Sequence, residues 1–237
     1  MQLDVLYHDD YLVAINKPAG LLVHRSSIDK YETKFAVQLL RDQIGQHVYP
    51  VHRLDKPTSG VLLFSLDSET TGLLSELFAR QEIKKEYRAI VRGYVKQEGI
   101  IDYALEKEPD KMADNTTFST IAQKAVTHYH RLSTFELPIA NQRYPSSRYS
   151  LVQLIPGTGR RHQLRRHMKH IFHPIIGDTT YGDGTQNQIF RNYLDCHRLM
   201  LHAHSMSFIH PHTGANIHIE ARAGEQFENT LHAVFPG

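Results

Sequence analysis

Cysteine is almost absent from this chain of 237 residues, and long apolar runs are absent altogether. Its one cysteine, Cys196, excludes an internal disulfide and a zinc site built from cysteines, and it favours a reducing compartment. No stretch approaches the roughly 18 consecutive apolar residues of a membrane-spanning helix. The first ten residues lack the basic region and apolar run of a signal peptide. These absences predict a cytoplasmic protein without a membrane partner.

Positive and negative side chains also nearly balance. The formal net charge is +2, which permits an RNA partner but does not require one. No internal repeat is present, and neither a G-x-G-x-x-G segment nor a P-loop motif occurs, so no nucleotide cofactor is predicted. With 41% hydrophobic residues the chain is long enough to bury a sizeable core.

The spacing of apolar residues predicts more strands than helices. Alternation or short apolar runs predict strands at 5–7, 11–15, 60–66, 85–92, 148–155, 199–209 and 216–221. Helical spacing predicts helices at 35–44, after an N-cap at Asp67 or Ser68, and at 162–170. Residues 107–123 and 181–187 are expected to form loops. Because strands and helices do not alternate strictly, the pattern predicts an α+β fold whose mixed, mostly antiparallel sheet is flanked by helices.

The most informative segment is 52–60, with the sequence HRLDKPTSG. Pro57 and Gly60 predict a turn directly before a buried strand, and Asp55 lies in that turn between Arg53 and Lys56. Neighbouring cations favour an ionised carboxylate, which makes Asp55 a candidate nucleophile. A surface turn with a solvated ion pair explains the same residues, and this segment alone favours that simpler interpretation.

A second segment, 157–169, places two glycines before a helix that is rich in cations. Its five Lys or Arg residues lie within ten positions: Arg160, Arg161, Arg165, Arg166 and Lys169. Leu164 and Met168, four residues apart, are expected to anchor the helix to the core. Like charges at this density repel one another, so contact with RNA phosphates is favoured over a merely solvated face.

A third segment, 84–88, places Tyr87 on the apolar face of a predicted strand whose other face is basic. A core tyrosine with a satisfied hydroxyl is the usual explanation for this pattern. The alternative is a platform on which an extruded RNA base stacks. The residues alone favour the core tyrosine.

Taken in order, these segments resemble the RluA family of pseudouridine synthases over nearly the whole chain. The resemblance rests on six segments: 16–20 followed by His24, 52–60, 85–87, 159–165, 173–178 and 198–203. It implies the pseudouridine synthase fold with an active-site cleft, in a single catalytic domain at 1–237 without an N-terminal S4-like module. It also implies an isomerisation that needs no cofactor.

The resemblance also implies roles for individual residues. Asp55 would be the catalytic carboxylate, Arg165 would pair with it, and Tyr87 would stack on the target uracil. Arg53 would displace the neighbours of the flipped base, and Leu164 or Ile176 would pack against the tyrosine ring. The expected RNA contacts are Arg53, Lys17, Arg160, Arg161, His162, Arg166 and Lys169.

One departure within the third motif narrows the expected substrate. Many family members have threonine where this chain has Arg161, and a second arginine follows at Arg166. This form resembles a subgroup that modifies the T stem of tRNA, which implies uridine-65 as the target and a monomeric enzyme whose partner is tRNA. Ribosomal RNA is the alternative substrate.

Two hypotheses from other classes compete with this interpretation. A metal-dependent hydrolase would use the histidines at 162, 167, 170 and 173, but they lack the H-E-x-x-H spacing and arginines lie between them. No metal site is therefore predicted. A non-catalytic RNA-binding module would use the same basic helix, but it would not need Asp55, Tyr87 and Arg165 together.

Overall fold

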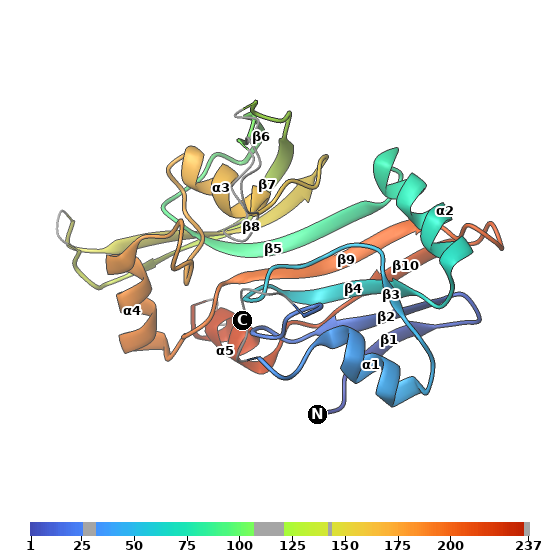
Figure 1. The fold of residues 1–237 in the computed structure, drawn as a ribbon. Helices are drawn as coiled ribbons and strands as arrows, with labels where there is room; N and C mark the ends of the chain where they lie inside the picture. The colour runs from blue at the N-terminus through green and yellow to red at the C-terminus, as the bar shows by residue number, and fades with distance from the viewer. Residues whose placement is uncertain (26–31, 107–120, 142–143, 235–237) are drawn as a thin grey trace. The chain divides into compact units, whose positions relative to one another are not determined.

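The chain folds into two compact units, and the computed structural model describes residues 1–25, 32–106, 121–141 and 144–234 (Figure 1). Within the described residues, the first unit contains Met1–Lys85, Ile121 and Ala203–Arg222. The second contains Glu86–Glu106, Ala122–His202 and the chain from Ala223 onward. The polypeptide therefore passes from the first unit to the second and later returns.

The first unit is built on a sheet with the strand order β1-β2-β4-β9. Its strands are β1 (Asp4–His8), β2 (Leu12–Lys17), β3 (Tyr49–Pro50), β4 (Ser59–Ser65), β9 (Leu201–Ile209, of which the first two residues belong to the second unit) and β10 (Asn216–Glu220). β1 and β2 form an antiparallel hairpin, β2 pairs antiparallel with β4, and β10 pairs antiparallel with β9. The helices are α1 (Ala36–Ile44) and α2 (Ser68–Ala79).

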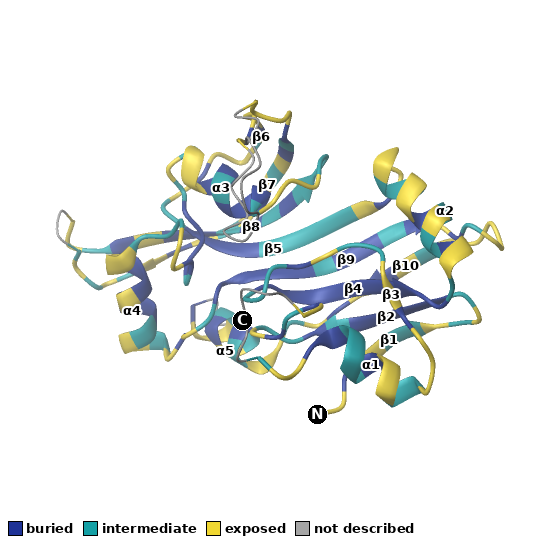
Figure 2. Ribbon diagram, in the orientation of Figure 1, coloured by how far each residue is buried: buried dark blue, intermediate teal, exposed yellow. Residues whose placement is uncertain are grey.

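β4 is the central strand of the first unit, and all seven of its residues are buried (Figure 2). Val61 and Leu63 join Leu12, Leu74 and Phe208 in one core cluster, so α2 is packed against the sheet. A strand buried on both faces has a continuous apolar sequence rather than an alternating one. This is why the short apolar run at 60–66 predicted a strand, and that prediction is confirmed.

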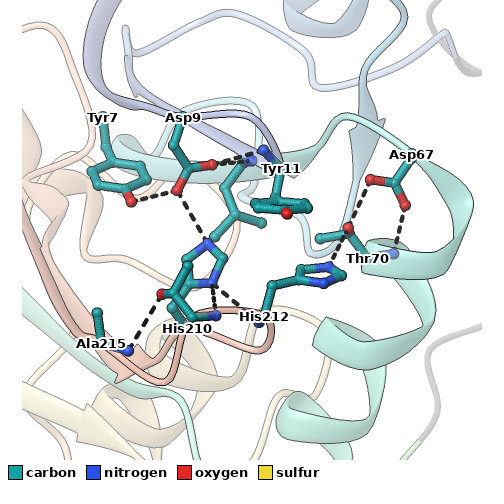
Figure 3. A network of polar contacts seen from close by, with 10 residues as sticks. Tyr7, Asp9, Tyr11, Asp67, Thr70, His210, His212 and Ala215 are labelled. Carbon is teal, nitrogen blue, oxygen red and sulfur yellow. Dashed lines mark hydrogen bonds and ion pairs between the residues drawn. The ribbon is translucent and has the colours of Figure 1, made fainter.

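Beyond the C-terminal end of β4, a polar network joins the β1–β2 turn, the β9–β10 turn and the start of α2 (Figure 3). The buried His210 accepts N–H bonds on Nδ1 from residues 212 and 213, so its Nε2 carries the hydrogen and donates to Asp9 at 3.1 Å. The His212 ring stacks on Tyr11 with centroids 4.1 Å apart and also contacts the Thr70 hydroxyl. The network fixes the end of the sheet opposite to Asp55, which precedes β4.

The second unit has the strand order β5-β8-β7-β6, with antiparallel pairing throughout. Its strands are β5 (Lys84–Arg92, of which the first two residues belong to the first unit), β6 (Glu98–Asp102), β7 (Val126–Leu137) and β8 (Ser147–Pro156). Its helices are α3 (Gln163–His170), α4 (Gly184–Leu194) and α5 (Glu225–Val234). Ala89 and Val91 of β5 face one core cluster and Ile90 faces another, so this strand is covered on both faces.

The predicted α+β class and mostly antiparallel sheet are confirmed. The predicted loop at 181–187 is wrong in its second half, because Asp183 caps a helix that begins at Gly184. The patterns did not delimit β3, β6, β7, α4 or α5. In the predicted loop at 107–123, residues 107–120 lie outside the described part of the chain. None of the helices within the described ranges is long and apolar enough to cross a membrane.

Candidate active site

Asp55 lies in a tight turn that leads into β4 in the first unit. The Thr58 N–H donates to the Asp55 carbonyl at 3.0 Å, which closes the turn around Lys56 and Pro57. Gly60 then adopts φ +113, and a Cβ at this position would lie 2.1 Å from the Ala203 carbonyl oxygen on β9. Glycine is thus required for β9 to approach, and this close packing fixes the strand from which the Asp55 turn projects.

Lys17 connects the first motif to the Asp55 turn from inside the unit. Its side chain is fully buried, and its ammonium donates to the carbonyls of Pro18, Leu21 and Lys56 at 2.9, 2.9 and 3.2 Å. The Gly20 N–H donates to the same Lys56 carbonyl at 2.8 Å. Lys17, which was expected to contact RNA, is thus buried in this structure, and its ammonium holds the turn through three carbonyls.

The two cations that flank Asp55 have different surroundings. Arg53 is exposed, as an RNA contact would need. Lys56 forms an ion pair with Glu32 at 2.7 Å. The positive charge that the sequence places next to Asp55 at this position is therefore offset by a carboxylate. Leu54, between them, is buried and anchors the segment to the core.

His52 supports the same segment in its neutral form. Its Nε2 accepts the Leu63 N–H at 3.0 Å, which requires an unprotonated nitrogen. Burial, assisted by the nearby Lys85 charge, lowers the pKa of His52 to about 3. The imidazole therefore serves as a neutral acceptor for the backbone of β4 at physiological pH.

In the second unit, Arg165 is held by Asp178. Nε and Nη2 of the guanidinium donate to the two carboxylate oxygens at 2.7 and 2.8 Å, and the side chains are only 6% and 1% exposed. Burial by itself raises the pKa of Asp178, but hydrogen bonds from Arg165 and the Tyr181 N–H outweigh it and lower the pKa below its ordinary value. The pair is thus ionised and fixed in a bidentate geometry.

The Tyr181 ring forms a second support for the same guanidinium. Arg165 lies over this ring at 5.1 Å and Lys169 at 5.8 Å, within the range of cation–π attraction. The Tyr181 hydroxyl contacts Nδ1 of His162 at 3.0 Å. His162 itself precedes α3 with φ +54, so the ring ties the entry of the helix to its cationic side chains.

α3 is anchored by apolar residues, as its spacing predicted. Leu164 and Met168 belong to the buried cluster that contains residues of β5 and β8, and Tyr87 packs against the same cluster. Ile176 belongs to the other cluster of the unit, with Tyr149 and Phe190. Leu164 thus shares its surroundings with Tyr87, as expected for a residue that packs near the tyrosine.

The remaining cations of the third motif surround α3. Arg160, Arg161 and Lys169 are exposed, whereas Arg166 is partly buried and donates to the Glu106 carbonyl at 3.0 Å. Arg160 donates through Nε to the Lys124 carbonyl at 3.1 Å. The exposed guanidinium groups of Arg160 and Arg161 lie just before the helix, and the Lys169 ammonium lies in its last turn. Exposed cations of this kind suit phosphate contacts.

The predicted site residues thus form two groups. The first unit contains Lys17, Arg53 and Asp55, and the second contains Tyr87, Ile176 and the α3 residues. Across the described parts of the chain, no three His, Cys, Asp or Glu side chains are arranged to hold a metal ion. The chemistry available is that of a partly buried carboxylate (Asp55), a buried guanidinium (Arg165) and a partly buried tyrosine (Tyr87).

The sequence matches the family model described as RNA pseudouridylate synthase over residues 11–170, more than half of the chain. The chain belongs to this family. The resemblance to RluA-type pseudouridine synthases is confirmed, and the protein is an isomerase.

Curated relatives match nearly the full length of this pseudouridine synthase. The tRNA pseudouridine synthase C of Haemophilus ducreyi is 57% identical over 228 residues, which cover 96% of this chain and 94% of the relative. The protein of the same name from Pasteurella multocida is 56% identical, with the same coverage. The solved structure of human RNA Pseudouridylate Synthase Domain Containing 4 has a TM-score of 0.71 at 27% identity and covers 97% of this chain and 92% of its own.

Asp178 and Tyr181, which support Arg165 in this pseudouridine synthase, were not among the predicted site residues. The segment 173–178 was recognised as a family segment, but Asp178 was given no role. A lone acidic residue after a cationic stretch of 21 residues without Asp or Glu (157–177) was the available signal. Its partner could not be chosen from five cations without the fold.

Proposed function

We propose that this pseudouridine synthase converts one uridine of tRNA, uridine-65 in the T stem, to pseudouridine. The observation that carries the proposal is the identity of 57% to a relative named tRNA pseudouridine synthase C over nearly the full length of both chains. Because this identity extends over 96% of this chain and 94% of the relative, the RNA class that the relative's name gives is the substrate that fits best.

We assign Asp55 as the catalytic carboxylate of this reaction. The turn that presents it is held from inside by Lys17 and from the strand side by the close packing of Gly60. A group held this way keeps its geometry while a substrate enters, which is what positioning in catalysis requires. The carboxylate either attacks the sugar or the uracil ring, or removes a sugar proton.

The reaction balances without a cofactor. The N1–C1′ bond breaks, the uracil turns, the C5–C1′ bond forms, C5 loses its proton and N1 gains one. Extrusion of the uridine from the stem costs a few kcal/mol, which stacking on Tyr87 and phosphate contacts offset. In this proposal Arg165 pairs with the catalytic carboxylate. Tyr87 stacks on the target uracil, and Arg53 displaces the neighbours of the flipped base. The two units form one catalytic domain, and the enzyme acts as a monomer.

The experiment measures release of tritium from tRNA labelled at C5 of uridine, together with mapping of pseudouridine along the tRNA. The native protein is expected to release one tritium per tRNA and to modify position 65. Asp55→Asn should reduce the rate by at least about a thousandfold, since it removes the reacting carboxylate, and should leave the Kd for tRNA within about threefold.

Two controls make the outcome decisive. A tRNA with cytidine at position 65 should release no tritium, whereas ribosomal RNA fragments should react far more slowly than tRNA. Substantial activity of Asp55→Asn would remove Asp55 from the reaction. Preferential modification of ribosomal RNA would overturn the tRNA assignment while leaving the enzyme class intact.

A further inference from the structure

The C-terminal end of α3 carries a bulky side chain where the backbone favours glycine. Phe172 has φ +64 and follows the last residues of the helix. The Phe172 N–H donates to the Lys169 carbonyl and the His173 N–H to the Met168 carbonyl, both at 2.9 Å, which is the Schellman arrangement. Glycine normally occupies this position because a side chain at positive φ is strained.

The Phe172 side chain gains little burial in return for this strain. It is 78% exposed, more than any other large hydrophobic side chain in the described residues. Its backbone is fixed from the other side, because Nη2 of Arg92 donates to the Phe172 carbonyl at 3.0 Å while Nη1 binds Asp183 at 2.6 Å. A strained and rigidly held aromatic that contributes nothing to the core indicates a contact with a partner.

The chemistry around Phe172 identifies that partner as RNA. Between residues 157 and 177 the chain has five Lys or Arg residues and no Asp or Glu. Lys169 and His170 lie three and two residues before the phenylalanine and are exposed. The His170 ring stacks on Tyr103, itself 45% exposed, with centroids 3.6 Å apart. Exposed aromatic faces among cations suit nucleotides, whose phosphates bind the cations and whose bases and sugars bind the rings.

We propose that Phe172 packs against a nucleotide of the substrate tRNA, next to phosphate contacts from Lys169 and the start of α3. This inference rests on the proposed function and adds a binding contact distant in sequence from Asp55. The ring acts on binding of the RNA and not on the chemistry of the target uridine. The left-handed backbone at Phe172 directs the ring toward solvent. A phenylalanine ring has fewer rotatable bonds than a longer side chain, so it loses less conformational freedom when it binds.

The test compares Phe172→Gly, Phe172→Tyr and the control Tyr193→Ala. Phe172→Gly relieves strain, so its Tm should be unchanged or about 2–4 °C higher, which removes misfolding as an explanation. Its Kd and KM for tRNA should rise about tenfold, the loss expected for one stacked base, while kcat at saturating tRNA stays within about twofold. Phe172→Tyr keeps the ring and should bind within about twofold of the native protein.

Tyr193 on α4 is 62% exposed and lies outside the cationic segment, so Tyr193→Ala should leave the Kd for tRNA unchanged. Unchanged binding by Phe172→Gly would overturn the inference, as would a lowered Tm, because the residue would then be structural. Equal losses in the tyrosine and glycine variants would also overturn it. Failure of the native protein to modify tRNA would instead contradict the proposed function, which the same assay reports separately.

Discussion

Asp178 binds Arg165 through both carboxylate oxygens, at 2.7 and 2.8 Å, where neither side chain is appreciably exposed to water. The backbone N–H groups of Thr180 and Tyr181 also donate to Asp178, both at 2.9 Å. The backbone of its own turn therefore positions the carboxylate independently of the guanidinium. Because Nε and Nη2 are bound to Asp178, this carboxylate sets the orientation of the whole Arg165 guanidinium.

The first prediction is that Asp178→Asn impairs both the fold and the reaction. The amide cannot accept two charge-assisted bonds, and a buried guanidinium loses its counter-charge, so the free energy of unfolding should fall by about 3 kcal/mol. Because Arg165 also loses its orientation, kcat for pseudouridine formation should fall at least about tenfold, with the Kd for tRNA within about threefold. Urea unfolding, tritium release and filter binding measure the three quantities.

Asp183→Asn is the matched control. Asp183 also binds an arginine, Arg92, but those side chains are 25% and 38% exposed, so loss of the pair should cost less than about 1 kcal/mol. Asparagine retains the cap on α4, since it accepts the Gln186 N–H as aspartate does. If the two variants were equally stable and active, Asp178 would have no special role in positioning Arg165.

The second prediction concerns acid and His52. The pKa of His52 is lowered to about 3 in the folded protein, whereas an unfolded histidine titrates near 6.5. The unfolded state therefore binds more protons between these values, so stability is fully present above pH 6.5 and is lost as the pH falls toward 3. Between pH 7.5 and 5 the contribution lost should be up to about 2 kcal/mol.

His52→Gln isolates this contribution from those of the other histidines. The glutamine amide oxygen still accepts the Leu63 N–H but does not titrate near neutral pH. Urea unfolding of both proteins at pH 7.5, 6 and 5 should give a difference in stability that shrinks as the pH falls. Parallel curves over this range would show that the imidazole is not held neutral by the fold.

Local patterns predicted the elements that carry the motifs, and long-range pairing decided the elements that were missed. The hairpin, β4, α2 with its Asp67 cap, and α3 each have a spacing or turn signal of their own. β7 has exposed polar residues along most of one face, and its position depends on pairing with β8 and β6. α4 was hidden because its first turn contains glycine and polar residues, whereas its buried apolar residues, Ile189 and Phe190, come later.

The candidate site shows the same division. A turn signal within nine consecutive residues made Asp55 a candidate, and the cationic helix predicted phosphate contacts near Arg165. The catalytic roles of both residues were expected only from the resemblance to the family. The surroundings of Lys17 were not predicted, since its ammonium is buried among three carbonyls. Such an arrangement depends on the approach of the segments 16–21 and 55–60, which no local pattern contains.

The third prediction separates two glycines of the first unit. Gly60→Ala should destabilise the protein by at least about 3 kcal/mol, because the backbone has φ +113 and the new Cβ would lie 2.1 Å from the Ala203 oxygen. Gly72→Ala lies in α2 with no atom within 4 Å of its Cβ, so it should stabilise the protein by up to about 1 kcal/mol. Thermal unfolding compares them, and a Gly60→Ala variant of native stability would contradict the packing of β9 on β4.

The last prediction concerns the cap of α2, where the polar network of Figure 3 meets the helix. Asp67 accepts the Thr70 N–H and the Thr70 hydroxyl, both at 2.7 Å. Because that hydroxyl hydrogen is used, His212 Nε2 must donate to the Thr70 oxygen, at 2.8 Å. Asp67→Ala removes the cap and loosens this chain of contacts.

Asp67→Ala should therefore lower the free energy of unfolding by about 1–2 kcal/mol, whereas Asp67→Asn, an equally good cap, should lose far less. The hydrogen bonds from Thr70, which outweigh the effect of burial, lower the pKa of Asp67. The difference between native protein and Asp67→Ala should then persist down to about pH 4 and shrink below it, as the carboxylate becomes protonated. Urea unfolding at pH 7, 4 and 3 tests this. An alanine variant as stable as the asparagine variant at pH 7 would show that the cap contributes nothing and that the turn contacts alone hold α2.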